Sequence, residues 1–266
     1  MNGSRPTKSL VIGLLALVLF LVPQALSAQE QAAGDAAAKE KLSPQQILEK
    51  MDAFTNGFDD QEMRITWLIY DVNGSTKSYD SVIQQKGRNK RLIRLTSGEL
   101  KDMAILTEDE NRMYVYLPGY KRIRRIANHG MKQSFVGSDY TNADMSTANY
   151  ADKYDAKLEK EDEKFWWLRL DPKPGADMDY GHLVMKIGKD VFRMWGASYY
   201  DKQGRHVKEF SIRDVKKFPR GVEWPEYVQM ADPQTGHRTE LHIKEFIVNQ
   251  GLKDSLFTQR SLQWSR

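Results

Sequence analysis

The side chains best suited to acid–base or nucleophilic chemistry lie close together near the middle of the chain. His129, Asp139 and Asp144 could act as general acids or bases, and Ser134 or Ser138 could supply a nucleophilic hydroxyl, as in a hydrolase. However, the sequence has no Gly-x-Ser-x-Gly elbow, no His-Glu-x-x-His zinc motif, no phosphate-binding glycine loop and no calcium-binding loop. We therefore expect no catalytic residues and a protein that is not an enzyme.

A structural interpretation accounts for the same residues. Gly137-Ser138-Asp139 is typical of a tight turn whose serine or aspartate side chain accepts hydrogen bonds from backbone amides. Thr141 or Asn142 is placed to cap a short helical turn that contains Asp144. The segment is therefore predicted to be a turn followed by a short helix.

Histidines and cysteines give no sign of a metal site or cofactor. His237 and His242 fall on one predicted strand, but five residues apart, which puts them on opposite faces. The absence of cysteine excludes disulfides, thiol catalysis, thiolate ligands and a lipobox for N-terminal lipidation. We expect no metal, no cofactor and a protein that is not itself lipidated.

The first 28 residues have the pattern of a signal peptide. Arg5 and Lys8 precede an apolar run over residues 10–22 that is short for a membrane span, and small residues follow it. Cleavage after Ser27 or Ala28 would export the protein without a membrane-spanning segment. It would also lower the count of Lys and Arg from 40 to 38, against 36 acidic residues.

A basic cluster precedes the predicted turn. It consists of Lys121, Arg122, Arg124 and Arg125. One interpretation is a solvated edge strand that its charges protect from aggregation. Another is a contact for an acidic membrane partner or for anionic lipid headgroups. Nucleic acid is disfavoured as a partner, because the charge of the exported chain is nearly balanced.

These segments must be positioned by the rest of the chain, which predicts one helix and then strands. With 29% charged and 40% hydrophobic residues, the chain can bury a sizeable core. After a polar lead-in over residues 29–41, Ser43, Pro44 and Gln46 form a helix start with a capping box. The apolar face of this helix would contain Ile47, Leu48, Met51 and Phe54.

The remaining elements alternate at strand period. Asn73-Gly74 is a strong hairpin signal between the first two strands. Strands are predicted over residues 63–71, 76–85, 90–96, 103–107, 112–117, 164–170, 182–187, 192–200, 207–215, 222–230 and 238–248. Ten or eleven strands at hairpin spacing predict a mainly β protein with a single curved antiparallel sheet, formed by one domain over residues 42–266.

The stretch Tyr114–Met145 resembles a known signature. A strand ending in Tyr-Leu-Pro, a basic Arg-Ile-Arg-Arg-Ile segment, then Ser-Phe-x-Gly-Ser-Asp-aromatic and a later Asp-Met are similar to the bacterial outer membrane lipoprotein-sorting family, of the LolA/LolB-like superfamily. The likeness continues through residues 170–175, 199–205, 235–239 and 254–258. Its signature loop would comprise Gly137, Ser138, Asp139, Tyr140 and Asp144.

This resemblance implies an incomplete, half-open β-barrel with a few helices packed on its concave face. It also implies a periplasmic carrier that binds acyl chains of lipoproteins or lipids and passes them from an inner-membrane exporter to an outer-membrane acceptor. The residues expected to contact acyl chains are Met63, Ile65, Trp67, Ile69, Met113, Val115, Phe135 and Met194. Two alternatives stay open: an envelope accessory protein that docks a transporter through its basic cluster, and an envelope lipid or glycan hydrolase.

Overall fold

The structure is a computed structural model that describes residues 41–109, 112–146, 149–176 and 178–264. Residues Leu42–Arg266 form one compact unit. The predicted signal peptide, residues 1–28, and most of the predicted lead-in, residues 29–41, lie outside the described residues. Within the described ranges, no helix is both long enough and apolar enough to cross a membrane.

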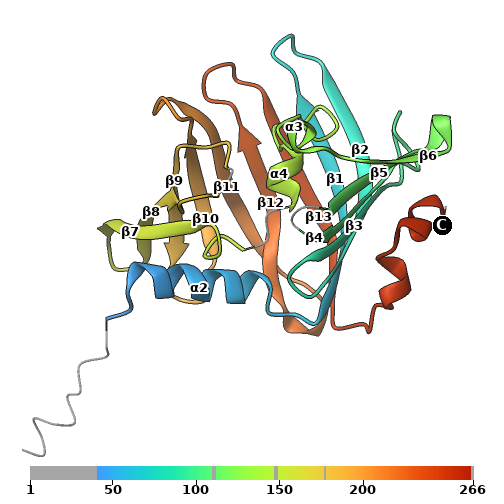
Figure 1. The fold of residues 1–266 in the computed structure, drawn as a ribbon. Coiled ribbons are helices and arrows are strands. Elements are labelled where there is room, and N and C mark those ends of the chain that lie inside the picture. Colours follow the sequence, from blue (N-terminus) through green and yellow to red (C-terminus); the bar gives the residue numbers. More distant parts are fainter. Residues whose placement is uncertain (1–40, 110–111, 147–148, 177, 265–266) are drawn as a thin grey trace, which may run out of the picture. The chain divides into compact units, whose positions relative to one another are not determined.

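Thirteen strands in the described ranges form one antiparallel sheet (Figure 1). They are β1 (Asp60–Tyr70), β2 (Thr76–Lys86), β3 (Lys90–Leu95), β4 (Ala104–Asp109), β5 (Arg112–Leu117), β6 (Arg122–Arg125), β7 (Tyr154–Glu161), β8 (Phe165–Pro172), β9 (His182–Gly188), β10 (Met194–Tyr200), β11 (His206–Lys217), β12 (Glu223–Ala231) and β13 (Arg238–Val248). Their order is β6-β5-β4-β3-β2-β1-β13-β12-β11-β10-β9-β8-β7. Because β6 and β7 do not pair, the sheet stays open.

The predicted fold class is confirmed: the protein is mainly β, with an open, curved antiparallel sheet and few helices. Eleven strands match the predicted ones within a few residues. The two edge strands were not among them, although an edge strand was one interpretation of the basic cluster that forms β6. In β7, Tyr154, Ala156 and Leu158 do alternate with charged residues, but the alternation is short and most of this edge strand is charged and exposed to solvent.

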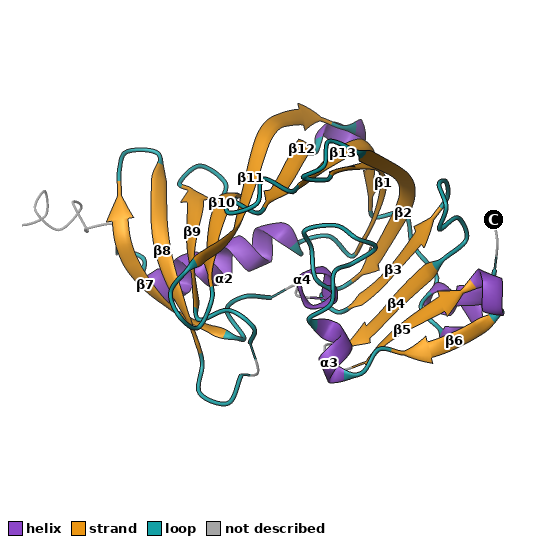
Figure 2. Cartoon of the chain, turned by 90° about the horizontal axis from the view of Figure 1, so that it is seen from above, coloured by secondary structure: helices purple, strands orange, loops and turns teal. Residues whose placement is uncertain are grey.

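The helix α2 (Pro44–Thr55) and the short helix α4 (Asn142–Ser146) lie inside the curve of the sheet, and α3 (Asn128–Met131) lies near its β5–β6 edge (Figure 2). The predicted capping box of α2 is present: Ser43 Oγ accepts from Gln46 N at 3.2 Å, and Ser43 N donates to Gln46 Oε1 at 2.8 Å. Its apolar face packs into the main core, so this helix covers part of the concave face.

Polar contacts fix α2 in place. The carboxylate of Asp52 is buried and accepts hydrogen bonds from Tyr150 N at 3.1 Å and Ala151 N at 2.7 Å, while burial raises its pKa. The side chain of Gln45 accepts from Ala156 N at 3.0 Å. These bonds tie the helix to the segment that leads into β7.

A second, smaller core lies on the convex face, where the C-terminal segment covers β3, β4 and β5. This segment contains two 3₁₀ helices, η3 (Asp254–Leu256) and η4 (Gln259–Gln263). Its Phe257 and Leu262 pack against Leu92, Ala104 and Leu106. The sheet is thus covered on both faces near this edge.

One aspartate anchors the start of the C-terminal segment. The buried carboxylate of Asp60 accepts hydrogen bonds from three consecutive backbone amides, Gln250 N and Gly251 N at 2.8 Å and Leu252 N at 2.9 Å. A carboxylate that satisfies three amides replaces the sheet partners that the chain loses as it leaves β13.

Replacing this anchor should loosen the C-terminal segment. Asp60→Ala should lower the free energy of unfolding in urea by roughly 2–4 kcal/mol, because three backbone amides lose the carboxylate that accepts their hydrogen bonds. Trypsin should also cleave after Lys253 faster than in the wild type. Asp59→Ala is the matched control, since this neighbouring side chain is exposed; equal effects of the two substitutions would contradict the anchoring role.

Candidate functional site

A cavity of about 550 Å³ lies between residues 126–146, which we call the signature segment, and the connection from β8 to β9. Its walls come from α3, α4, the residues before β7, the β8–β9 connection, and the inner faces of β9 and β10. They include the apolar side chains Ile126, Met131, Met178 and Leu183, the tyrosines Tyr150, Tyr154, Tyr180 and Tyr199, and the charged Lys132, Asp144, Asp152, Lys153, Lys173 and Asp179. The cavity therefore combines an apolar and aromatic wall with fixed charges.

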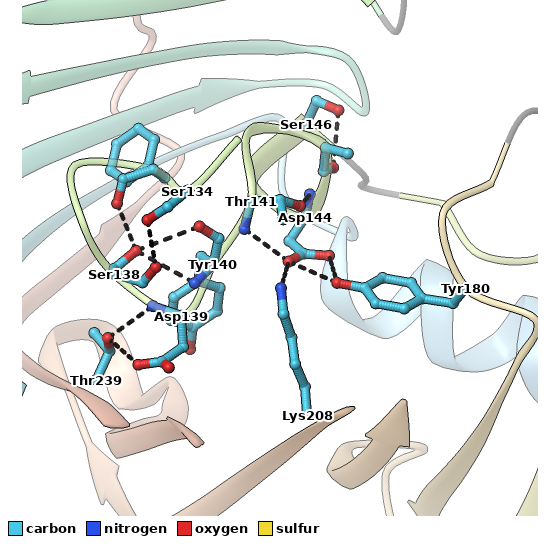
Figure 3. A network of polar contacts seen from close by, with 12 residues as sticks. Ser134, Ser138, Asp139, Tyr140, Thr141, Asp144, Ser146, Tyr180, Lys208 and Thr239 are labelled. Carbon is cyan, nitrogen blue, oxygen red and sulfur yellow. Dashed lines mark hydrogen bonds and ion pairs between the residues drawn. The ribbon is translucent and has the colours of Figure 1, made fainter. Parts of the chain in front are cut away.

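Asp144 is the best-connected polar group of this wall (Figure 3). Its carboxylate accepts from Thr141 N at 2.8 Å, from Tyr180 Oη at 3.1 and 3.2 Å, and from Lys208 Nζ at 2.9 Å. The side chains of Lys208 and Asp144 are 16% and 10% exposed. Thr141 Oγ1 accepts from Asp144 N at 3.0 Å, so the predicted helical turn exists and Thr141 caps it.

The tyrosines form a second buried network beside Asp144. The hydroxyls of Tyr150 and Tyr199 are hydrogen-bonded to each other, and the rings of Tyr180 and Tyr199 meet edge to face at 4.9 Å between centroids. Burial raises the pKa of Tyr150 to about 12 and also raises the pKa of Tyr180 and of Tyr199. At neutral pH these side chains therefore present uncharged hydroxyls.

Asp139 ties the signature segment to the sheet rather than to its own backbone. Its carboxylate accepts from Thr239 Oγ1 at 2.6 Å and lies 2.7 Å from His237 Nδ1, and its own N–H donates to Thr239 Oγ1 at 3.0 Å. The predicted turn contact to a backbone amide is made by Ser138 instead, whose Oγ accepts from Tyr140 N at 3.3 Å. The acid thus bridges two segments that are about a hundred residues apart in sequence, as Figure 3 shows for Thr239.

The residues that the sequence suggested for a hydrolase site do not form a catalytic arrangement among the described residues. No hydrogen bond within these ranges joins His129 to Asp139 or Asp144. Ser134 Oγ donates to the carbonyl of Ser138 at 2.6 Å, and Ser138 Oγ donates to the carbonyl of Phe135 at 2.6 Å. Both hydroxyls therefore stabilise the turn, and neither faces a general base.

The residues predicted to contact acyl chains belong to the main core. Five are buried (Ile65, Trp67, Ile69, Met113 and Phe135), and three pack against the same cluster at partial burial (Met63, Val115 and Met194). The Trp67 ring meets Phe135 at 5.3 Å and Tyr140 at 6.0 Å, because the signature segment lies on this part of the concave face. None of the eight lines the 550 Å³ cavity, so their contact with acyl chains stays a prediction.

Several cavity residues were not singled out from the sequence. Tyr150 and Tyr180 of the cavity wall lie outside strands. Lys208, which pairs with Asp144 of the wall, is one of several charged residues on the long strand β11, so none of the three stands out by pattern. A usable signal did exist in the family likeness, because its segments 170–175 and 199–205 contain Lys173 and Tyr199 of the cavity wall.

The basic cluster forms the edge strand β6 and the residue before it. Lys121, Arg122, Arg124 and Arg125 are exposed. This position matches the edge-strand interpretation. Contact with a partner or with lipid headgroups stays a prediction.

Three solved proteins are similar to this chain in fold. A DUF1329 family protein from Desulfovibrio piger has a TM-score of 0.76, with 24% identity over 83% of this chain and 100% of its own. A putative outer membrane lipoprotein-sorting protein domain from Vibrio parahaemolyticus has a TM-score of 0.74, with 20% identity over 83% and 98%. A LolA superfamily protein from Nitrosomonas europaea has a TM-score of 0.68, with 20% identity over 83% and 99%. The chain therefore shares its fold with these three structures.

A family model described as an uncharacterized protein matches residues 87–264, which is more than half of the chain. The chain belongs to the family that this model defines, and the resemblance seen in the sequence is confirmed. No curated protein matches the chain.

The Asp144–Lys208 pair should be strongly coupled. Asp144→Asn and Lys208→Gln should each lower the free energy of unfolding by roughly 2–3 kcal/mol, because each leaves a buried charge without its partner. The double variant should lose at least about 1 kcal/mol less than the sum of the two single effects. The more exposed pair Lys216–Glu226, 3.1 Å apart, is the control and should couple by less than about 0.5 kcal/mol. Additive effects at Asp144 and Lys208 would contradict the network.

The buried tyrosines should make the protein sensitive to alkali. Because the pKa of Tyr150 is about 12 in the folded protein and about 10 in an unfolded chain, its contribution is fully present below pH 10 and is lost as pH rises to about 12. Urea unfolding measured from about pH 8 to 11.5 should show this loss. Tyr150→Phe should reduce the slope of the free energy of unfolding against pH by up to about 1.4 kcal/mol per pH unit. Parallel curves for the wild type and this variant would contradict the contribution of Tyr150.

Proposed function

We propose that this protein is a periplasmic, non-enzymatic carrier that holds an acyl chain of a lipid or lipoprotein in the cavity beside α4 and passes it toward the outer membrane. The cavity carries this proposal. Its volume of about 550 Å³ falls within the range of about 300–1,000 Å³ typical of small-molecule sites. The likeness in fold to a putative lipoprotein-sorting domain from Vibrio parahaemolyticus supports the same proposal.

The acyl chain would enter between α4 and the β8–β9 connection. There it would meet the apolar side chains of Met131, Met178 and Leu183, while the hydroxyls and charges around them are already hydrogen-bonded to the protein. Contact with the Trp67 ring would require the signature segment to leave the concave face, because Phe135 and Tyr140 of that segment cover this ring. The cavity and the predicted contact residues are thus two successive parts of one concave face.

No bond is made or broken in this proposal, and no metal or cofactor takes part. Transfer depends on differences in affinity between donor, carrier and acceptor. Its partners would be an inner-membrane exporter and an outer-membrane acceptor. The signal peptide predicted over residues 1–28 would export the chain, and the absence of cysteine would leave it without a lipid anchor.

Native mass spectrometry with lipid extraction tests the proposal on protein purified from a periplasmic fraction without detergent. A bound lipid or acylated peptide at stoichiometric level is the expected result. In parallel, the protein should bind the fluorescent fatty acid cis-parinaric acid. Ala176→Trp, which puts an indole at the cavity wall, should weaken this binding at least tenfold. Ala53→Trp, on the exposed side of α2, should not change it.

A second candidate function is an accessory protein whose cavity stays empty and whose basic cluster docks a transporter. The exposure of Lys121, Arg122, Arg124 and Arg125 on an edge strand favours it. If the protein is isolated without a ligand and does not bind cis-parinaric acid, this second candidate function would be favoured. Reversing the charges at Arg122, Arg124 and Arg125 would then abolish function in cells.

A further inference from the structure

The β6 edge of the sheet carries cationic side chains that have no acidic partner among the described residues. Lys121, Arg122 and Arg124 are exposed, and none of their side chains forms an ion pair or hydrogen bond with another described residue. Other arginines are fully engaged, as when Arg94 donates to the carbonyls of Ser261 at 2.8 Å and Leu262 at 3.2 Å. Neighbouring cations without counter-charges repel one another, so this edge favours an anionic partner.

The C-terminal segment adds to the same edge. Leu262, in η4, packs in the convex core cluster against which Ile123 of β6 also packs. Figures 1 and 2 both place the C-terminal segment beside β5 and β6. Arg260 lies in η4, within this C-terminal segment; it is exposed, and its side chain likewise has no ion pair with a described residue.

Two aromatic rings accompany these charges. Tyr120, directly before the basic cluster, is 73% exposed, and Trp264, directly after η4, is 44% exposed. A tyrosine or tryptophan with one apolar and one polar end is suited to the boundary between lipid headgroups and acyl chains. Among the described acids of β4 and its connections, Glu108 and Asp109 pair with Arg112, and Glu99 and Asp102 lie on the β3–β4 connection beside Lys101. We call the set Tyr120, Lys121, Arg122, Arg124, Arg260 and Trp264 the β6-edge surface.

We propose that the β6-edge surface docks the protein on the anionic lipid surface of a membrane. Guanidinium groups would pair with lipid phosphates, and each basic residue at an anionic surface strengthens partitioning by about fivefold. The two rings would insert at headgroup depth. The cavity is not part of this contact, because none of the six residues lines it.

A lipid surface fits these residues better than an acidic protein does. A stable protein interface needs a contiguous patch of roughly 800 Å² on each partner with an apolar, aromatic centre. Here the large exposed rings are single and come from separate elements, Tyr120 before β6 and Trp264 after η4, with cations in between. Such a scattered arrangement suits many equivalent phosphates rather than one complementary partner.

The test is co-sedimentation of the protein from the periplasmic fraction with vesicles. We expect binding to vesicles of phosphatidylglycerol and phosphatidylethanolamine, little binding to phosphatidylcholine vesicles, and release as the salt rises from about 0.1 to 1 M, where the screening length falls from about 10 to 3 Å. The triple variant R122Q/R124Q/R260Q should lower the partition coefficient at least tenfold, and up to about 100-fold.

The matched control removes the same charge elsewhere: K77Q/K202Q/K244Q alters three exposed lysines on other elements and should bind as the wild type does. Tyr120→Ser with Trp264→Ser should weaken binding while leaving its salt dependence unchanged. The proposal is overturned if the control triple variant loses as much binding as R122Q/R124Q/R260Q. It is also overturned if the protein does not bind protein-free vesicles and binds only native membranes, because that result would indicate a protein partner instead.

Discussion

An open antiparallel sheet leaves one apolar concave face without a second sheet to cover it, and this constraint shapes the whole protein. A closed barrel would fill its own interior, but β6 and β7 do not meet. The chain must therefore supply other segments to exclude water from Trp67, Phe246 and the rest of the main core. It uses α2 and the signature segment inside the curve. On the convex face, the C-terminal segment covers the second, smaller core.

Each covering segment is held by a mostly buried aspartate, which is the common device of this fold. Asp52 fixes α2 to the segment before β7, and Asp60 holds the start of the C-terminal segment. Asp139 and Asp144 fasten the signature segment to β13 and β11. A buried carboxylate is stable only when several donors surround it, so these four sites also determine where each segment can lie.

The signature residues that first suggested chemistry thus have a structural role that is connected to the cavity. Asp144 belongs to the cavity wall and at the same time caps α4 and pairs with Lys208. Asp139 keeps Phe135 and Tyr140 against Trp67. The same contacts that cover the concave face therefore limit the space that remains for a ligand, which links the stability of the signature segment to the size of the site.

The sequence by itself determined the local structure and the family. Alternation predicted eleven strands, the Ser43–Gln46 capping box predicted the start of α2, and Thr141 was rightly among the expected caps of α4, because such signals act within a few residues. The edge strand β7 was missed, because its short alternation of Tyr154, Ala156 and Leu158 lies among charged residues. Only the tertiary structure decided that Asp139 meets Thr239 and His237, that Asp144 meets Lys208, and that the cavity opens beside α4 instead of at the Trp67 face. Those contacts join residues that are about 60 to 100 positions apart, and their partners depend on how the open sheet curves and which segment covers it, which no local pattern of residues specifies.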